Sequence, residues 1–236
     1  MKLTRQDRQV INNFAKFNQN LEFKKDLKTD DTWNGYVCEY TLESDEFKSF
    51  IIYDTPEFLK LYNCFINPKV SILDDKIIFN EHNTEFQYHT SEREICRLPT
   101  KTIAEFIDNK IPDTQFELTF DDIKSIKRIR EIIHLSSLII KPDEDNYHCI
   151  VLTGIKDKSS PEFTLTTYHK TNRDYKVRCR VPKESILISN YKVSIFEKFM
   201  LLESKDIPLK YLIALEPKPT PDSKEDREII NYYAKN

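Results

Sequence analysis

Apolar residues recur at helical spacing in two stretches of this chain, residues 2–17 and 117–133. Placing successive residues 100° apart puts the apolar side chains of each stretch on one side of a helix. The predicted buried faces consist of Val10, Ile11, Phe14 and Phe17 in the first stretch and of Ile126, Ile129 and Ile133 in the second. Both stretches therefore predict an amphipathic helix with one face against a core.

The two stretches also align with each other without a gap. Leu3, Thr4 and Asp7 of the first correspond to Leu118, Thr119 and Asp122 of the second. A Thr followed three residues later by an acid is a capping-box pattern, which favours a helix start at the same place in both copies. Further along, "KVSIL" at 69–73 recurs as "KVSIF" at 192–196. Two matches in the same order predict one structural unit used twice.

Strand-like sequence with β-branched and aromatic residues follows each predicted helix. The predicted strands cover 33–42, 47–53, 70–73, 76–80, 84–90 and 93–98 in the first copy and 137–141, 147–155, 162–169, 175–181, 191–203 and 208–216 in the second. A short helix is predicted at 54–65, and "PKES" from residue 182 marks a shorter counterpart. The fold class is therefore α+β, with more strand than helix.

The repeats define the predicted organisation of the chain. Residues 1–98 form the first domain and 117–217 the second. The segment 99–116 connects them, and its prolines at 99 and 112 limit regular structure. The final segment, 218–236, is rich in proline and charge and is expected to be a mobile tail whose end becomes helical.

Cations gather on the polar faces of the predicted helices, although the chain as a whole is mildly acidic. The formal net charge is −3 over 236 residues, so a nucleic-acid partner cannot be argued from the total. The cations opposite the apolar faces are Arg5, Arg8 and Lys16 in the first helix and Lys124, Lys127 and Arg128 in the second, with Lys60 on the polar side of 54–65. The distribution of charge, not its sum, suggests an anionic partner.

Composition excludes several function classes. The two glycines, Gly35 and Gly154, are too few and too scattered for a phosphate-cradling loop or a dinucleotide fingerprint. The five cysteines form no C-x-x-C pair, so reduced and buried thiols are expected. No signal-peptide core and no run of about 20 apolar residues is present, so we expect a cytoplasmic protein.

Three stretches, "MKLTRQDRQVINNFAKFNQ", "FIIYDTPEFLKLYNCF" and "KYLIALEP", resemble the corresponding parts of sliding clamps from T4-type bacteriophages. The resemblance covers about residues 1–217 and rests on hydrophobic patterns with a few identities. It implies a ring of three identical subunits, each with two clamp domains, that encircles duplex DNA and tethers the replicative polymerase. Sheets would form the outer wall of the ring, and helices would line the hole.

The resemblance also assigns roles to residues. The DNA-facing candidates are Arg5, Arg8, Lys16, Lys60, Lys124, Lys127, Arg128 and Lys183. The candidates for a groove that holds the C-terminal peptide of a polymerase are Ile103, Phe106, Ile107, Ile111, Ala214, Leu215 and Pro217. An alternative is that the connector residues only fasten the connector to its own domain. A separate clamp-loader ATPase would open the ring, and no catalytic residue, metal or cofactor is expected.

Two further expectations concern surfaces. Subunits of the family meet through edge strands, and the candidate edges here are 84–97 and 162–169. In the tail, Ile229 precedes Tyr232 and Tyr233 with a spacing similar to that of anchors in clamp-binding peptides. The tail would then fill the partner groove of a clamp, or, alternatively, it carries two tyrosines without such a role.

Three other functions compete with the clamp. A monomeric DNA-binding accessory protein would need a more basic surface, because affinity would have to replace encirclement. A structural virion protein would leave the cationic helix faces unexplained. A metal-dependent nuclease would use some of the five histidines, but their spacing matches no metal-ligand pattern such as H-E-x-x-H; they are His82, His89, His134, His148 and His169.

Overall fold

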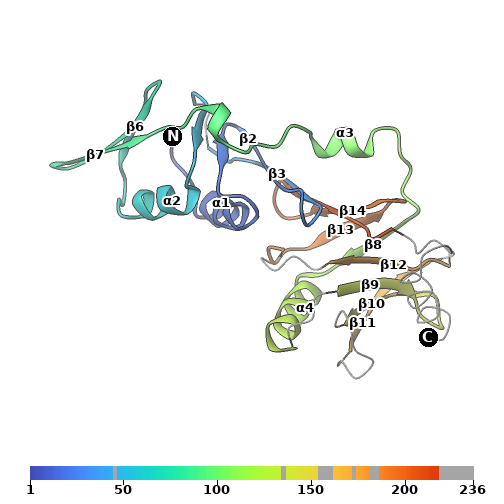
Figure 1. Ribbon diagram of the computed structural model, residues 1–236. Coiled ribbons are helices and arrows are strands. Elements are labelled where there is room, and N and C mark those ends of the chain that lie inside the picture. The colour runs from blue at the N-terminus through green and yellow to red at the C-terminus, as the bar shows by residue number, and fades with distance from the viewer. Residues whose placement is uncertain (45–46, 134–136, 154–161, 172–173, 181–185, 218–236) are drawn as a thin grey trace.

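A computed structural model describes residues 1–217 except 45–46, 134–136, 154–161, 172–173 and 181–185 (Figure 1). Both halves contain a helix followed by strands. The elements of the first half are α1 Arg5–Phe17, β1 Leu21–Phe23, β2 Asp26–Asp31, β3 Tyr36–Thr41, β4 Phe50–Ile52, α2 Thr55–Asn63, β5 Lys69–Ile72, β6 Lys76–Glu81 and β7 Thr84–His89. A 3-10 turn, Arg93–Ile95, and the short helix α3, Ile103–Ile107, lead into the second half.

The second half repeats this plan with longer strands. Its elements are β8 Thr114–Leu118, α4 Phe120–Ile133, β9 Ser137–Pro142, β10 Tyr147–Thr153, β11 Phe163–Lys170, β12 Val177–Arg180, β13 Tyr191–Ile195, β14 Phe199–Ser204 and β15 Leu209–Ala214. Mixed helices and antiparallel strands confirm the predicted α+β class. Within the described part of the chain, no helix is long and apolar enough to cross a membrane.

A six-stranded antiparallel sheet joins the two halves, in the order β2-β3-β15-β14-β13-β8. Its central pairing is between β3 of the first half and β15 of the second, with Cys38 opposite Tyr211 and Val37 opposite Leu212. The last described strand of the chain therefore continues the sheet of the first repeat. This pairing makes the two repeats a single framework.

The two faces of this sheet carry different elements. Side chains alternate between the faces along a strand, so Tyr211 and Ile213 point to one face while Leu212 points to the other. The first face packs in one continuous core with Phe14 of α1 and Ile123 of α4. The opposite face, here called the outer face, is covered by α3. In Figure 1, α3 accordingly lies on the far side of the sheet from α1, α2 and α4.

Smaller sheets complete each half. The first half adds the three-stranded sheet β5-β6-β7 and the pair β1-β4, and the second half adds the four-stranded sheet β11-β10-β9-β12. The strands β7 and β11 are the outermost described strands of their sheets, so the candidate edges 84–97 and 162–169 each contain an outermost strand, although the first strand ends at His89. On β7, Phe86 and Tyr88 pack inward, while Glu85, Gln87 and His89 are exposed.

Several predicted elements differ from the structure. Within 93–98, where a strand was predicted, Arg93–Ile95 form a 3-10 turn and the remaining residues are in no helix or strand, and 191–203 is two strands that reverse at residues 196–198. The strands β1, β2 and β8 were not predicted. The connector contains a helical turn because Thr102 and Glu105 form a capping box, with Glu105 N 3.2 Å from Thr102 Oγ1.

Candidate nucleic-acid interface

The helix α1 is held by a buried cap. Thr4 Oγ1 accepts a 3.1 Å hydrogen bond from Asp7 N, and Asp7 Oδ2 accepts one of 2.8 Å from Thr4 N, so the predicted capping box is confirmed. The predicted apolar face, Val10, Ile11, Phe14 and Phe17, is buried. Because that face is fixed in the core, Arg5 and Lys16 stand exposed on the opposite side.

The helix α2 packs beside α1 for similar reasons. Asp54 Oδ1 accepts a 2.9 Å hydrogen bond from Glu57 N, and Pro56 occupies the first turn, where no intrahelical donor is needed. Phe58 is fully buried. The Tyr62 hydroxyl accepts a 2.9 Å hydrogen bond from Leu3 N, which ties the end of α2 to the entry of α1. The polar side of α2, with Lys60, therefore faces outward next to the polar side of α1.

A hollow of about 500 Å³ lies between the two helices. It is lined by Arg5, Arg8, Gln9, Asn12, Pro56, Leu59, Lys60 and Asn63. The cations Arg5, Arg8 and Lys60, predicted from separate segments, thus meet at one surface, and the residues that line the hollow include no acid. Arg8 Nη1 donates a 3.1 Å hydrogen bond to Asn63 Oδ1, which orients the guanidinium across the hollow. We name Arg5, Arg8 and Lys60 the cation cluster.

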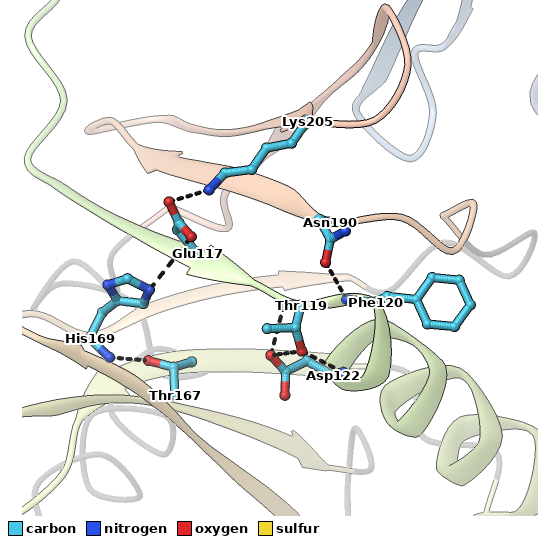
Figure 2. Close-up of polar contacts among 8 residues, drawn as sticks. All are labelled: Glu117, Thr119, Phe120, Asp122, Thr167, His169, Asn190 and Lys205. Carbon is cyan, nitrogen blue, oxygen red and sulfur yellow. Dashed lines mark hydrogen bonds and ion pairs between the residues drawn. The ribbon is translucent and has the colours of Figure 1, made fainter.

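The helix α4, the counterpart of α1 in the second repeat, is held in place by a network of hydrogen bonds that Figure 2 shows. Asp122 N donates to Thr119 Oγ1 at 3.2 Å, and Thr119 N donates to Asp122 Oδ2 at 2.8 Å, which confirms the second capping box. Asn190 Oδ1 accepts from Phe120 N at 2.9 Å. Asn190 is itself held by Asp206, whose pKa is lowered by the hydrogen bonds from Asn190 and Ser189. The start of α4 is therefore fastened to the loop before β13.

The buried face of α4 differs from the prediction. Ile123 is buried and Ile126 is half-buried, whereas Ile129 is half-buried outside the main core. The side chain of Ile133 lies outside the described residues. Lys124 and Arg128 are exposed, as expected for DNA-facing cations.

Lys127 has a different environment from its neighbours on α4. It is half-buried and, with Arg130, lines an apolar hollow between α4 and the sheets. Its alkyl stem therefore covers apolar surface, which leaves its ammonium group as the part available to an anion. Lys183, the remaining DNA-facing candidate, lies outside the described residues.

An acidic residue, Glu117, also lies close to the start of α4. Figure 2 shows Glu117 of β8 bonded to the Lys205 ammonium and 3.9 Å from His169 Nε2 of β11. The hydrogen bond from Lys205 lowers the pKa of Glu117. Because Lys205 already neutralises this carboxylate, it adds little repulsion for an anion near α4.

The candidate groove residues do not form one set. Ile103 is buried against Phe196, Leu201 and Leu212, and Phe106 and Ile107 pack beside it. These three connector residues therefore fasten α3 to the outer face. Ile111 is 88% exposed.

The strand-end candidates divide between the two faces of the sheet. Ala214 is half-buried opposite Phe199, and Pro217 is exposed. Leu215 packs against the main core, on the helix side of the sheet.

Trp33 is a surface residue that the sequence reasoning missed. It is 86% exposed in the turn between β2 and β3. That turn abuts the end of β15, because Gly35 O accepts a 2.8 Å hydrogen bond from Ala214 N. Gly35 has φ +75°, and a Cβ at this position would lie 2.6 Å from Ala214 Cβ. A lone tryptophan followed by Asn-Gly, the signature of a tight turn, is a signal that could have indicated it.

Among the described residues, no group of three or more His, Cys, Asp and Glu side chains is arranged to hold a metal ion. His148 is buried on the ring of Phe116 with its Nδ1 next to the Tyr175 hydroxyl, and His82 and His89 are exposed. His134 lies outside the described residues.

No protein-family model matches the chain, and no curated protein matches its sequence. Solved structures match its fold. A Helicobacter pylori beta clamp superposes with a TM-score of 0.64 at 14% identity, over 94% of this chain and 65% of the other. The same clamp bound to a DNA ligase peptide gives 0.61 at 13%, over 94% and 68%. Proliferating Cellular Nuclear Antigen from Entamoeba histolytica gives 0.62 at 13%, over 89% and 94%.

The chain thus spans about two thirds of the length of the bacterial clamps and nearly all of the length of the Entamoeba protein. These likenesses extend over both halves and over the shared sheet. The chain has the fold of a sliding clamp.

Proposed function

We propose that this chain is the subunit of a ring-shaped sliding clamp that encircles duplex DNA and tethers a replicative DNA polymerase. One observation carries the proposal. The cation cluster lies in a hollow between α1 and α2, on the same side of the shared sheet as α4 with Lys124 and Arg128. Both repeats thus present capped helices with outward cations to one side of a sliding-clamp fold.

The chemistry of this surface suits sliding rather than sequence reading. Contacts from Lys and Arg to phosphates are independent of sequence and weaken as salt rises. Arg5, Lys60, Lys124 and Arg128 are exposed, flexible side chains on different elements, so they can follow the phosphates without a fixed register. Such a lining attracts duplex DNA and lets it move.

Retention would then come from encirclement. A closed ring keeps a bound polymerase at high effective concentration near its primer without tight contacts to DNA. This explains why a clamp subunit can have a net charge of −3. A monomeric accessory protein without a ring would have to hold DNA by positive charge alone, and this chain has no excess of positive charge.

The ring would close through the outermost strands. We propose that β7 of one subunit pairs antiparallel with β11 of the next, because each is the outermost strand of its sheet within the described part of the chain. We further propose three subunits, with clamp domains at 1–98 and 117–217, as the resemblance to T4-type phage clamps implies. A viral replisome in the host cytoplasm is the corresponding setting.

The partners would bind outside the ring. The H. pylori clamp has been solved with a DNA ligase peptide, which supports peptide binding by proteins of this fold. We propose that the C-terminal peptide of the polymerase binds where β15 ends, near Ala214, Pro217 and Ile111. A separate clamp-loader ATPase would open the ring for DNA.

Light scattering and DNA retention test the proposal. We expect the mass of three chains in solution and, with a loader and ATP, retention on nicked circular DNA that is lost when the circle is cut. Retention on linear and circular DNA alike would contradict encirclement. A mass of one chain together with strong direct binding would instead favour the monomeric accessory protein.

A further inference from the structure

Apolar side chains that are exposed or half-buried lie on four adjoining segments: the β2–β3 turn, the start of β14, the end of β15 and the connector. We call this set the outer-face patch, and it consists of Trp33, Phe106, Ile111, Phe199 and Ala214. Trp33 and Ile111 are 86% and 88% exposed. The other three are half-buried. Large apolar side chains gathered at a surface indicate an interaction site.

Backbone pairing and ring contacts bring the segments of the outer-face patch together. Ala214 lies opposite Phe199 in the sheet, and its N–H donates a 2.8 Å hydrogen bond to Gly35 O, two residues after Trp33. The rings of Phe199 and Phe106 are 5.6 Å apart in an edge-to-face arrangement. The Lys110 ammonium lies 5.2 Å from the centre of the Phe199 ring, and Ile111 is the next residue in the chain.

The chain itself supplies a segment suited to this surface. Residues 218–236 follow Pro217, three positions after Ala214. Within this segment the large apolar side chains are close together, as Ile229, Ile230, Tyr232 and Tyr233. The preceding residues 222–228 hold four acids and two bases, a net charge of −2. Two exposed cations, Lys110 and Lys198, lie next to Phe199 and offer partners for these acids, beside the exposed acids Glu197 and Glu216.

We propose that residues 218–236 bind the outer-face patch of their own subunit, with Ile229–Tyr233 covering its apolar side chains. The tail would thereby compete with a partner peptide for the end of β15. This competition rests on the proposed function, whereas the contact between tail and patch does not.

The tether makes such binding effective even if the contact is weak. The eleven residues 218–228 span up to about 36 Å, since an extended chain covers roughly 3.3 Å per residue. A short flexible tether gives an effective concentration on the order of 1 mM. A tail with a dissociation constant of about 0.1 mM would then be bound about 90% of the time, and a partner peptide would bind about tenfold more weakly.

Trp33 reports on this contact because it is the only tryptophan in the sequence and the tail contains none. We compare the full chain with a variant of equal length that carries Ile229→Ser, Tyr232→Ser and Tyr233→Ser. With excitation of tryptophan alone, the full chain should show emission at shorter wavelength and less quenching by acrylamide. Asn231→Ser, in the same segment, is the control and should match the unaltered chain.

Peptide binding provides the second measurement. A synthetic peptide of residues 222–236, added to the triple-serine variant, should restore the protected Trp33 emission and saturate. A full chain quenched as strongly as the variant, or a peptide without effect, would overturn the proposal. Protection that disappears on dilution would assign the tail to a neighbouring copy and overturn the intramolecular contact.

The two proposals fail in different ways. The Trp33 measurements need neither a ring nor DNA, so a chain that stays monomeric would still reveal tail binding. Conversely, a ring retained on circular DNA with an unprotected Trp33 would leave the clamp proposal intact and refute this one. Deletion of 218–236 should raise the affinity for a polymerase C-terminal peptide about tenfold, and an unchanged affinity would refute the competition.

Discussion

The Tyr40 hydroxyl donates a 3.0 Å hydrogen bond to Asp7 Oδ1, and this bond joins the start of α1 to β3. Asp7 is fully buried and also accepts from the backbone N–H groups of Thr4 and Glu43. Burial raises the pKa of Tyr40. A cap that would be a local feature in an isolated helix is therefore part of the core of the first repeat.

This difference in burial predicts different costs for equivalent substitutions. Asp7→Ala leaves three donors without their acceptor inside the protein, and we expect it to lower the free energy of unfolding by about 3 kcal/mol. Asp122→Ala removes the same box at α4, where Thr119 is exposed and water replaces the lost bonds, and we expect about 1 kcal/mol. Urea unfolding of the two variants measures both values. Equal losses would show that burial of the first box adds nothing.

The repeat, the caps and the sites of α1, α2 and α4 could be predicted because they depend on local sequence. Thr4 and Asp7 form their box within one turn, and the apolar spacing of α1 determines which side carries Arg5 and Lys16. The pairing of β3 with β15 could not be predicted, since it joins residues about 170 positions apart and no local pattern encodes it. The shift of the buried face of α4 to Ile123 has the same origin, because it depends on which strands lie beneath the helix.

The surface sites were less predictable than the helices. The cations Arg5, Arg8 and Lys60 meet because α1 and α2 pack together. The spacing of apolar residues within each helix does not predict that packing. For the groove, apolar character indicated Ile103 and Ile111 equally, but one is buried and the other 88% exposed. Only the contact of α3 with the outer face distinguishes them.

Removing charge from the cation cluster should weaken DNA association without unfolding the protein. For Arg8→Gln and Lys60→Gln we expect duplex binding to weaken uniformly across sequences, and the slope of log affinity against log salt to fall by about one per contact. Fluorescence anisotropy with duplexes of two unrelated sequences measures both effects. Lys192→Gln is the matched control, because Lys192 is exposed on the outer face of the same sheet. An equally large loss of DNA affinity in the control would show that the cation cluster is not part of the DNA interface.

The proposed subunit contact predicts a register. Phe86 and Tyr88 pack inward on β7, and Leu165 and Thr167 do so on β11, so an antiparallel pairing that keeps both sets on one face places Gln87 opposite Thr164, Thr166 or Tyr168. We propose Thr166, the middle position, as the partner of Gln87. In a Cys64→Ser, Cys96→Ser background, Gln87→Cys with Thr166→Cys should give covalent trimers with a short bis-maleimide.

The matched control keeps Gln87→Cys and moves the second cysteine to Lys192→Cys, on the outer face. It should give no crosslinked species above the background of single-cysteine variants. Trimers by light scattering without crosslinks at 87 and 166 would contradict this register while leaving the ring intact.

His148 predicts how stability depends on pH. Burial lowers the pKa of His148 to about 4, and a protonated ring would place an N–H at Nε2, which has no hydrogen-bond partner among the described residues. An exposed histidine has a pKa of about 6.5, so between pH 6.5 and 4 the unfolded chain binds more protons than the folded one. The contribution of His148 to stability is therefore complete above pH 6.5 and is lost as the pH drops to 4, by about 3 kcal/mol.

The measurement is the free energy of unfolding in urea at pH 7.0, 5.5 and 4.5 for the unaltered chain and for His148→Asn. Asparagine does not titrate, so the difference between the two proteins should shrink as the pH falls, whatever the variant costs at pH 7. His89→Gln is the control, because His89 is exposed on β7 and lies in the other half of the molecule from His148, so its profile should run parallel to that of the unaltered chain. Parallel profiles for His148→Asn and the unaltered chain would mean that His148 stays accessible to protons. That result would contradict its position in the packed interior, where β10 places its ring against the ring of Phe116.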